Sequence, residues 1–282
     1  MIMSSRIIWS DNSVIKDISV NQNSYADGSD VIDYVAGQDY IFIGADFPFN
    51  HRHINVLVSN AVSSIASVDL WDGKTWNPAV DIIDQTKVLG ASMSESGVIS
   101  WRPDENTQWQ KDDTNLNNHS ITGLSSLKIF GLYWARLSWS VSWTGTTALS
   151  YIGHKFSEDY DMFILYPEFS LSTVKGQFLT GKTTWDEQHL QAGIAIIRDL
   201  KKMRVAVSGN QILDWEIFKE ASVHKTAAII YQAFGKDFFP NADRAEAKYK
   251  ESIENSIKLI DQNNDAKVQS QERLSIDGWI SR

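Results

Sequence analysis

One segment near the C-terminus carries oxygen-bearing side chains at the spacing of a calcium-binding loop. Residues 261–272 read DQNNDAKVQSQE. An EF-hand loop takes side-chain oxygens from positions 1, 3 and 5, a backbone carbonyl from position 7 and a bidentate glutamate from position 12. Asp261, Asn263, Asp265 and Glu272 fill the side-chain positions, and Lys267 would supply the carbonyl. The spacing therefore predicts a Ca²⁺ site in this loop.

This loop departs from the EF-hand pattern at its sixth position. Ala266 stands where the sharp turn normally requires glycine. Left-handed backbone costs an alanine roughly 1 kcal/mol, so we expect weaker ion binding. The sequence has no second loop of this kind, whereas EF-hands usually pair. The alternative is a polar turn that ends a helix.

Other candidate groups for chemistry are less specific. His51 and His53 would lie on one face of a strand and could hold a metal, although hydrogen-bonding side chains are the simpler interpretation. Carboxylate pairs such as Asp81 and Asp84 could serve glycoside hydrolysis, yet acidic loops explain them equally well. We find no serine elbow, P-loop, HExxH or dinucleotide-binding motif, and the chain has no cysteine. We therefore expect no enzymatic activity.

The first half of the chain has the pattern of an antiparallel β-sandwich. Tyr133–Trp143 alternates polar and apolar residues, as a half-buried strand does. Asp72-Gly73 lies between two apolar runs and predicts a hairpin. Short strands with no intervening helix favour a sandwich or barrel. We expect further strands at Val31–Val35, Tyr40–Ile43, His53–Val58, Ser67–Leu70, Ala79–Ile83, Val98–Trp101 and Ser126–Ile129.

The second half has the period of amphipathic helices. Apolar residues recur at helical spacing over about 185–203, 211–234 and 241–260. Thr184 to Glu187 has the pattern of a capping box that opens the first of these helices. The sequence thus predicts an α+β multidomain chain, with a Trp-rich β-sandwich over 1–154 and a small helical bundle over 155–282.

Charge and composition limit the partners of the chain. The net charge is −9. Residues 1–154 carry 9 basic and 16 acidic residues, whereas residues 155–282 carry 17 and 19. With no basic patch, we expect no tight binding to nucleic acid. No segment resembles a signal peptide or a membrane span, so we expect a protein made in the cytoplasm that stays there or leaves by lysis inside a larger particle.

Three segments of the helical half carry a resemblance to a known family. They are TTWDEQHL from residue 183, QILDWE from residue 211 and SVHKTAAIIY from residue 222. Together with the helix that follows, they resemble the head–tail adaptor proteins of tailed bacteriophages, also called head-completion or connector proteins. The resemblance implies a helical bundle that docks under the portal ring, with copies forming a dodecameric collar in a virion. It also implies that genomic DNA passes the collar without specific binding, in a protein made in the host cytoplasm. It places Trp185, His189, Trp215 and Tyr231 at the interface.

The β half resembles sandwich modules of phage virion proteins. The resemblance lies in FIGADFPFN from residue 42, LWDGKTW from residue 70 and SGVISW from residue 96. It implies a non-catalytic virion protein of the neck, between the portal ring and a downstream neck or tail protein. A baseplate or decoration protein stays open. A carbohydrate-binding module is the other alternative, with Trp71, Trp76 and Trp109 as its stacking platform.

Overall fold

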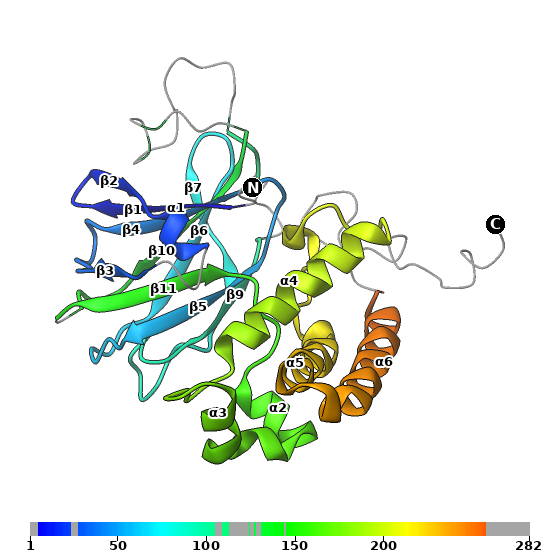
Figure 1. The fold of residues 1–282 in the computed structure, drawn as a ribbon. Coiled ribbons are helices and arrows are strands. Elements are labelled where there is room, and N and C mark those ends of the chain that lie inside the picture. The colour runs from blue at the N-terminus through cyan, green and yellow to red at the C-terminus, as the bar shows by residue number, and fades with distance from the viewer. Residues whose placement is uncertain are drawn as a thin grey trace. The chain divides into compact units, whose positions relative to one another are not determined.

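The chain folds into two compact units. The computed structural model describes residues 5–23, 28–104, 109–112, 124, 127, 131–143 and 145–257. Within them, one unit extends to Gly153 and the other begins at His154. The first unit holds the strands and the second holds the long helices (Figure 1). The division predicted from the sequence lies between residues 154 and 155.

The first unit is a sandwich of two antiparallel sheets, which confirms the predicted fold class. The order of the six-stranded sheet is β2-β1-β4-β10-β6-β7, and that of the five-stranded sheet is β3-β11-β5-β9-β8. A four-residue helix, α1 (Ser19–Gln22), follows the second strand. The strands are β1 (Ser5–Asp11), β2 (Val14–Asp17), β3 (Asp30–Ile32), β4 (Tyr40–Ala45), β5 (His51–Val58), β6 (Ala66–Trp71), β7 (Trp76–Pro78), β8 (Val80–Asp84), β9 (Gly97–Arg102), β10 (Tyr133–Trp139) and β11 (Thr147–Gly153).

Alternation along β10 shows how the sequence builds this sandwich. Ala135, Leu137 and Trp139 point into the core between the sheets. Trp134 points to the other face, where it packs in a second apolar cluster with Trp71. Side chains at successive strand positions face opposite sides, so both clusters follow directly from the sequence.

The turn prediction at Asp72-Gly73 is confirmed. Trp71 pairs with Trp76 across the turn, and Asp72 N–H donates to the Thr75 carbonyl at 3.1 Å. The carboxylate of Asp72 accepts two further backbone hydrogen bonds within the turn, from Lys74 and Thr75. β1, β2 and β11 were not expected from the sequence, and β7 was expected only as the second strand of this hairpin. The predicted strand Ser126–Ile129 lies largely outside the described residues.

The second unit is helical. Its core forms two clusters, one around Phe156, Ile196 and Tyr249 and the other around Trp185, Val223 and Ala242. The α-helices are α2 (Asp159–Leu165), α3 (Ser172–Phe178), α4 (Asp186–Lys202), α5 (Lys219–Phe234) and α6 (Phe239–Ser256). Short 3-10 turns connect them: η1 (Pro167–Ser170), η2 (Gly209–Gln211), η3 (Glu216–Phe218) and η4 (Lys236–Phe238).

Two helix starts differ from the sequence prediction. The expected capping box at Thr184 is wrong, because α4 begins at Asp186 and Trp185 precedes it without a side-chain cap. The backbone N–H of Trp185 instead donates to Asp159 Oδ1 at 2.9 Å. The helix expected from residue 211 begins at Lys219, because η2 and η3 occupy the preceding residues. Tertiary contacts override local helix signals at both places.

Candidate functional site

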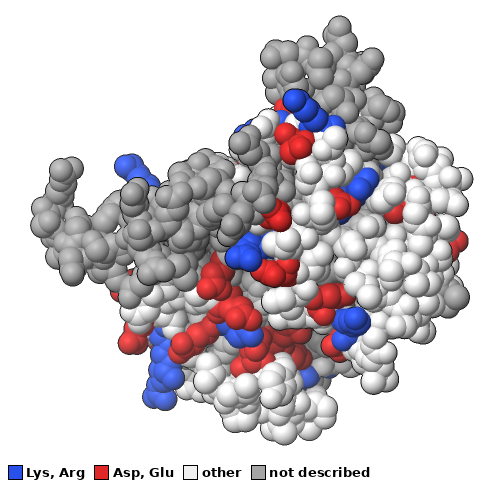
Figure 2. Space-filling model, turned by 180° about the vertical axis from the view of Figure 1, so that it is seen from behind, with Lys and Arg blue, Asp and Glu red and all other residues white. Residues whose placement is uncertain are grey.

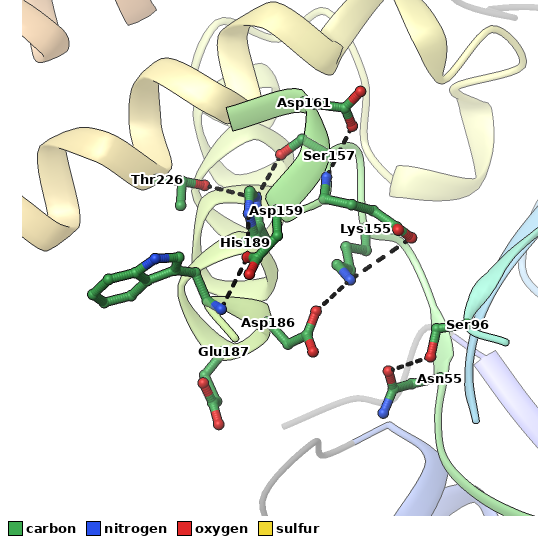
Figure 3. Close-up of polar contacts among 12 residues, drawn as sticks. Asn55, Ser96, Lys155, Ser157, Asp159, Asp161, Asp186, Glu187, His189 and Thr226 are labelled. Atoms are coloured by element: carbon green, nitrogen blue, oxygen red, sulfur yellow. Dashed lines mark hydrogen bonds and ion pairs between the residues drawn. The ribbon is translucent and has the colours of Figure 1, made fainter. Parts of the chain in front are cut away.

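A buried polar network in the helical unit brings together a serine, a histidine and an aspartate. Ser157 Oγ lies 2.8 Å from His189 Nδ1, and His189 Nε2 lies 3.4 Å from Asp159 Oδ1 (Figure 3). Ser157 and Asp159 lie at the start of α2, whereas His189 projects from the first turns of α4. These are the three residue types of a hydrolase triad, so their accessibility decides what they can do.

Hydroxyl groups of α5 complete the surroundings of the imidazole. Ser222 Oγ lies 2.7 Å from Ser157 Oγ, and Thr226 Oγ1 lies 3.2 Å from His189 Nδ1. Thr226 donates its hydroxyl proton to the Ser222 carbonyl at 2.8 Å. Ser157 can therefore donate to Nδ1, while Nε2 faces Asp159 at 3.4 Å, beyond a short hydrogen bond.

Asp159 connects the network to two further segments. It accepts the backbone N–H of Trp185 and lies 3.4 Å from Lys175 Nζ on α3. Lys175 also donates to the Thr183 carbonyl at 2.8 Å. Burial acts to raise the pKa of Asp159, but the contacts with His189, Trp185 and Lys175 outweigh it and lower the pKa. One carboxylate thus joins α2, α3 and α4.

A second buried ion pair lies beside this network. Lys155 Nζ lies 2.8 Å from Asp186 Oδ1, at the first position of α4. Burial opposes the charge on Asp186, yet Lys155 lowers the pKa of this carboxyl to about 2. An acidic residue in the first helical turn also interacts favourably with the helix dipole. Lys155 therefore fixes the start of α4 against the segment that leads into α2.

Burial of the serine and the histidine limits the chemistry that this network can do. His189 is 0% exposed, and Ser157 and Ser222 are also buried. Burial lowers the pKa of His189, although Asp159 acts to raise it. The lowered pKa favours the neutral ring. A nucleophile must reach a substrate, and the described residues leave Ser157 no route to one. The arrangement is suited to holding four helices together.

An open pocket lies on another side of the helical unit. Its volume is about 490 Å³, and α5, α6, η3 and the end of α2 provide its walls. His224 contacts Tyr166 Oη through Nδ1 at 2.9 Å and Glu220 through Nε2 at 3.4 Å. Burial lowers the pKa of His224 although Glu220 opposes the shift. The lining is Leu165, Ile217, Glu220, His224, Lys248, Glu251, Ser252, Asn255 and Ser256. Its mixed charges do not select one ligand class.

The predicted calcium loop, residues 261–272, lies outside the described residues. Asp261, Asn263, Asp265, Lys267 and Glu272 are therefore not placed, and this site stays a prediction. Within the described part of the chain, no three His, Asp or Glu residues are grouped to hold a metal ion. His51 and His53 both lie buried on β5.

Three of the four predicted interface residues are buried in the helical unit: Trp185, His189 and Tyr231. Trp185 is buried and donates its indole N–H to the Phe169 carbonyl at 2.9 Å. His189 belongs to the network, and Tyr231 Oη donates to Glu168. Trp215 is partly buried, with Lys219 Nζ 5.3 Å from its ring. A role for these residues in an interface stays a prediction.

Different residues of this unit present apolar side chains to solvent. Several lie within residues 160–183, where the sequence pattern is ambiguous. The exposed side chains of this segment are Tyr160, Ile164, Leu165, Leu171 and Leu179, and those elsewhere in the unit are Ile194, Val207, Phe238 and Phe239.

One of the three tryptophans expected to form an exposed sugar-stacking platform is buried. Trp71 is 1% exposed and packs edge-on against Trp76, with ring centroids 5.4 Å apart. Trp109 is partly buried and donates its indole N–H to the Trp134 carbonyl. Three solvent-facing indoles on one face are therefore not present.

Comparisons of the chain with protein-family models, curated proteins and solved structures find no match. Among the described residues, no helix is long and apolar enough to cross a membrane.

Proposed function

We propose that this chain is a non-catalytic structural subunit of a tailed-bacteriophage particle, where copies of it form a ring at the head–tail junction. The observation that carries the proposal is the set of large apolar side chains exposed on α2, α3 and their flanks. Tyr160 and Ile164 are one helical turn apart, and Leu171 and Leu179 flank α3. Exposed apolar side chains gathered in one segment mark contact surfaces between proteins.

The buried network supports a structural role. Its serine and histidine are buried, and its members contact one another and neighbouring helices. Contacts of this kind favour one arrangement of the unit, which suits a subunit held between two other rings.

The surface charge suits a protein beside a DNA channel. Figure 2 shows acidic side chains gathered in the lower half of one face, with basic side chains among them. The net charge of −9 gives DNA no basic path to bind, so DNA can pass without being held. The partners that we propose are the portal ring, a downstream neck or tail protein and further copies of the chain.

Labelling the chain within particles tests this proposal. We expect a tagged full-length chain to be incorporated into virions and to appear at the neck in cryo-electron micrographs. A label at the baseplate, or particles that lack the chain, would contradict the neck position. Hydrolysis of ester substrates that disappears in Ser157→Ala, with folding retained, would contradict the non-catalytic role.

A further inference from the structure

The short helix α2 is held at each end by a buried histidine. At its start, Ser157 and Asp159 face His189 of α4. At its end, Tyr166 Oη lies 2.9 Å from Nδ1 of His224, which belongs to α5. His189 is 0% exposed and His224 is 4% exposed. Two long helices thus each contribute one imidazole to the same seven-residue helix.

The two histidines have the same polar surroundings. In each, a hydroxyl group lies within hydrogen-bond distance of Nδ1, at 2.8 Å for Ser157 and 2.9 Å for Tyr166. In each, a carboxylate lies 3.4 Å from Nε2, that of Asp159 or that of Glu220. The carboxylate favours a proton on Nε2, so Nδ1 of the neutral ring keeps its lone pair and accepts the hydroxyl proton. Both ends of α2 are therefore held through a neutral imidazole.

A proton added to either ring would disturb these contacts. Nδ1 would then carry a proton and point it at the hydroxyl group that had donated to it, so the hydroxyl proton must turn away. Ser157 Oγ also lies 2.7 Å from Ser222 Oγ, so at the first ring the change reaches α5 as well. A charged imidazole is moreover costly in a buried position.

The charged groups around His189 do not reverse this preference. Asp159 on α2 and Asp186 on α4 favour a proton on the ring, whereas Lys155 opposes it. Lys175 of α3 lies 3.4 Å from Asp159 and offsets part of its charge. α5 faces the ring with hydroxyl groups. Burial is the largest influence, and the pKa of His189 is lowered.

The charged groups around His224 give the same result. Glu220 on α5 and Glu251 on α6 favour the charged ring, Lys248 on α6 opposes it, and the end of α2 brings the hydroxyl of Tyr166. Burial is again the largest influence and lowers the pKa. If α2 moves away, water reaches both rings and their pKa values return toward about 6.5. Below that pH, the open form therefore binds protons more readily than the closed form.

We infer that His189 and His224 form a proton-sensitive catch that releases α2 in mild acid. A helix of seven residues is too short to persist without its tertiary contacts, so the loss of both ends frees the segment. α2 carries the exposed Tyr160 and Ile164, so in the proposed ring acid would also alter a contact surface. That consequence rests on the proposed function, whereas the catch itself does not.

A cysteine beneath α2 reports its release, because the chain contains no other thiol. Met162 lies on the inner face of α2 and is 0% exposed. The thiol of Met162→Cys should react with dithiodipyridine at least about fivefold faster at pH 5.5 than at pH 7.5, after correction by the rate for glutathione. Met93→Cys is the matched control, because Met93 is 0% exposed in the sandwich. Its corrected rate should not rise.

Glutamine variants separate titration from packing. Glutamine can accept the hydroxyl proton through its side-chain carbonyl, but it takes up no proton in this pH range. The acceleration should therefore disappear when Met162→Cys is combined with His189→Gln and His224→Gln. Acceleration that persists in this combination would overturn the inference, and so would equal acceleration in Met93→Cys or none in Met162→Cys.

Hydrogen exchange of the parent chain tests the inference even if a variant does not fold. Amides of α2 should lose protection at pH 5.5 relative to pH 7.5, whereas those of α6 should keep theirs. Equal losses in both helices would indicate acid unfolding of the whole unit, and unchanged protection of α2 would indicate no release. Either result overturns the inference and leaves the neck position to the labelling experiment.

Discussion

The sandwich unit and the helical unit use buried polar groups differently. In the sandwich, the buried carboxylates of Asp39 and Asp112 accept backbone hydrogen bonds from loops. Its core consists of apolar and aromatic side chains, such as Tyr34 against Trp139 and Trp143. In the helical unit, buried polar groups connect the elements themselves, because His189 and Asp159 contact residues from four segments.

This difference predicts different weaknesses. A sheet keeps its arrangement through backbone hydrogen bonds, so a lost side-chain contact costs stability without releasing the strands. Helices satisfy their own backbones, and their arrangement depends on what fills the space between them. Removing a buried charged group from the helical unit should therefore loosen its packing.

Asp159→Ala should have the largest effect. The substitution leaves Lys175 without its carboxylate, and Trp185 N–H and His189 lose an acceptor. We expect the helical unit to lose about 3 kcal/mol of stability. Urea unfolding followed by circular dichroism at 222 nm measures it. Asp11→Ala, which removes an exposed ion pair with Lys16, should change stability by less than about 0.5 kcal/mol. Equal losses of stability in the two variants would contradict the structural role of the Asp159 network.

Tyr34→Phe tests the sandwich with a smaller change. Tyr34 Oη donates to the Trp139 carbonyl at 2.8 Å and accepts from Trp139 N–H at 2.7 Å. Removing the hydroxyl leaves both backbone groups unpaired, so we expect a loss of roughly 1–3 kcal/mol. Tryptophan fluorescence during urea unfolding would follow it. A loss that appears in the helical signal and not in the fluorescence would contradict the assignment of this contact to the sandwich.

Acid should weaken the helical unit. The pKa values of His189 and His224 are lowered by burial in the folded state. As the pH falls, the two histidines bind protons in the unfolded chain before they do so in the folded chain. The stability of the folded chain is therefore full above about pH 6.5 and is lost as the pH falls below it. Urea midpoints at pH 7.5, 6.5 and 5.5 measure this slope. The change of the urea midpoint with pH should be smaller in His189→Gln than in the parent. An identical change in both would show that His189 does not cause the pH dependence.

Calcium should produce the smallest effect. If residues 261–272 bind the ion only in the folded chain, millimolar calcium raises the melting temperature relative to chelator. Ala266→Gly should strengthen the effect, because glycine accepts a left-handed turn. Glu272→Gln should abolish it. A melting temperature that is the same in all these conditions would show that the loop is an ordinary polar turn.

The sequence predicted the two kinds of structure but not the buried network. Alternation in Tyr133–Trp143 and the turn at Asp72-Gly73 depend on neighbouring residues, so local patterns reveal them. β1 and β11 were missed because their residues are buried along nearly their whole length and show little alternation.

The network joins residues up to 65 positions apart, whose proximity local patterns do not encode. Ser157 and His189 are 32 positions apart, and Ser157 and Ser222 are 65 apart. His189 lies in the first turns of α4, so a histidine near the start of an amphipathic helix was the only sequence signal for the network.

Hydrogen exchange of the full-length Asp159→Ala chain tests the central claim most directly. The claim is that the Ser157–His189–Asp159 network is the structural joint of the helical unit. We predict that amides of α4 and α5 lose protection relative to the parent chain, while those of β4, β5 and β10 keep theirs. Unchanged protection in α4 and α5, or an equal loss in the strands, would contradict it.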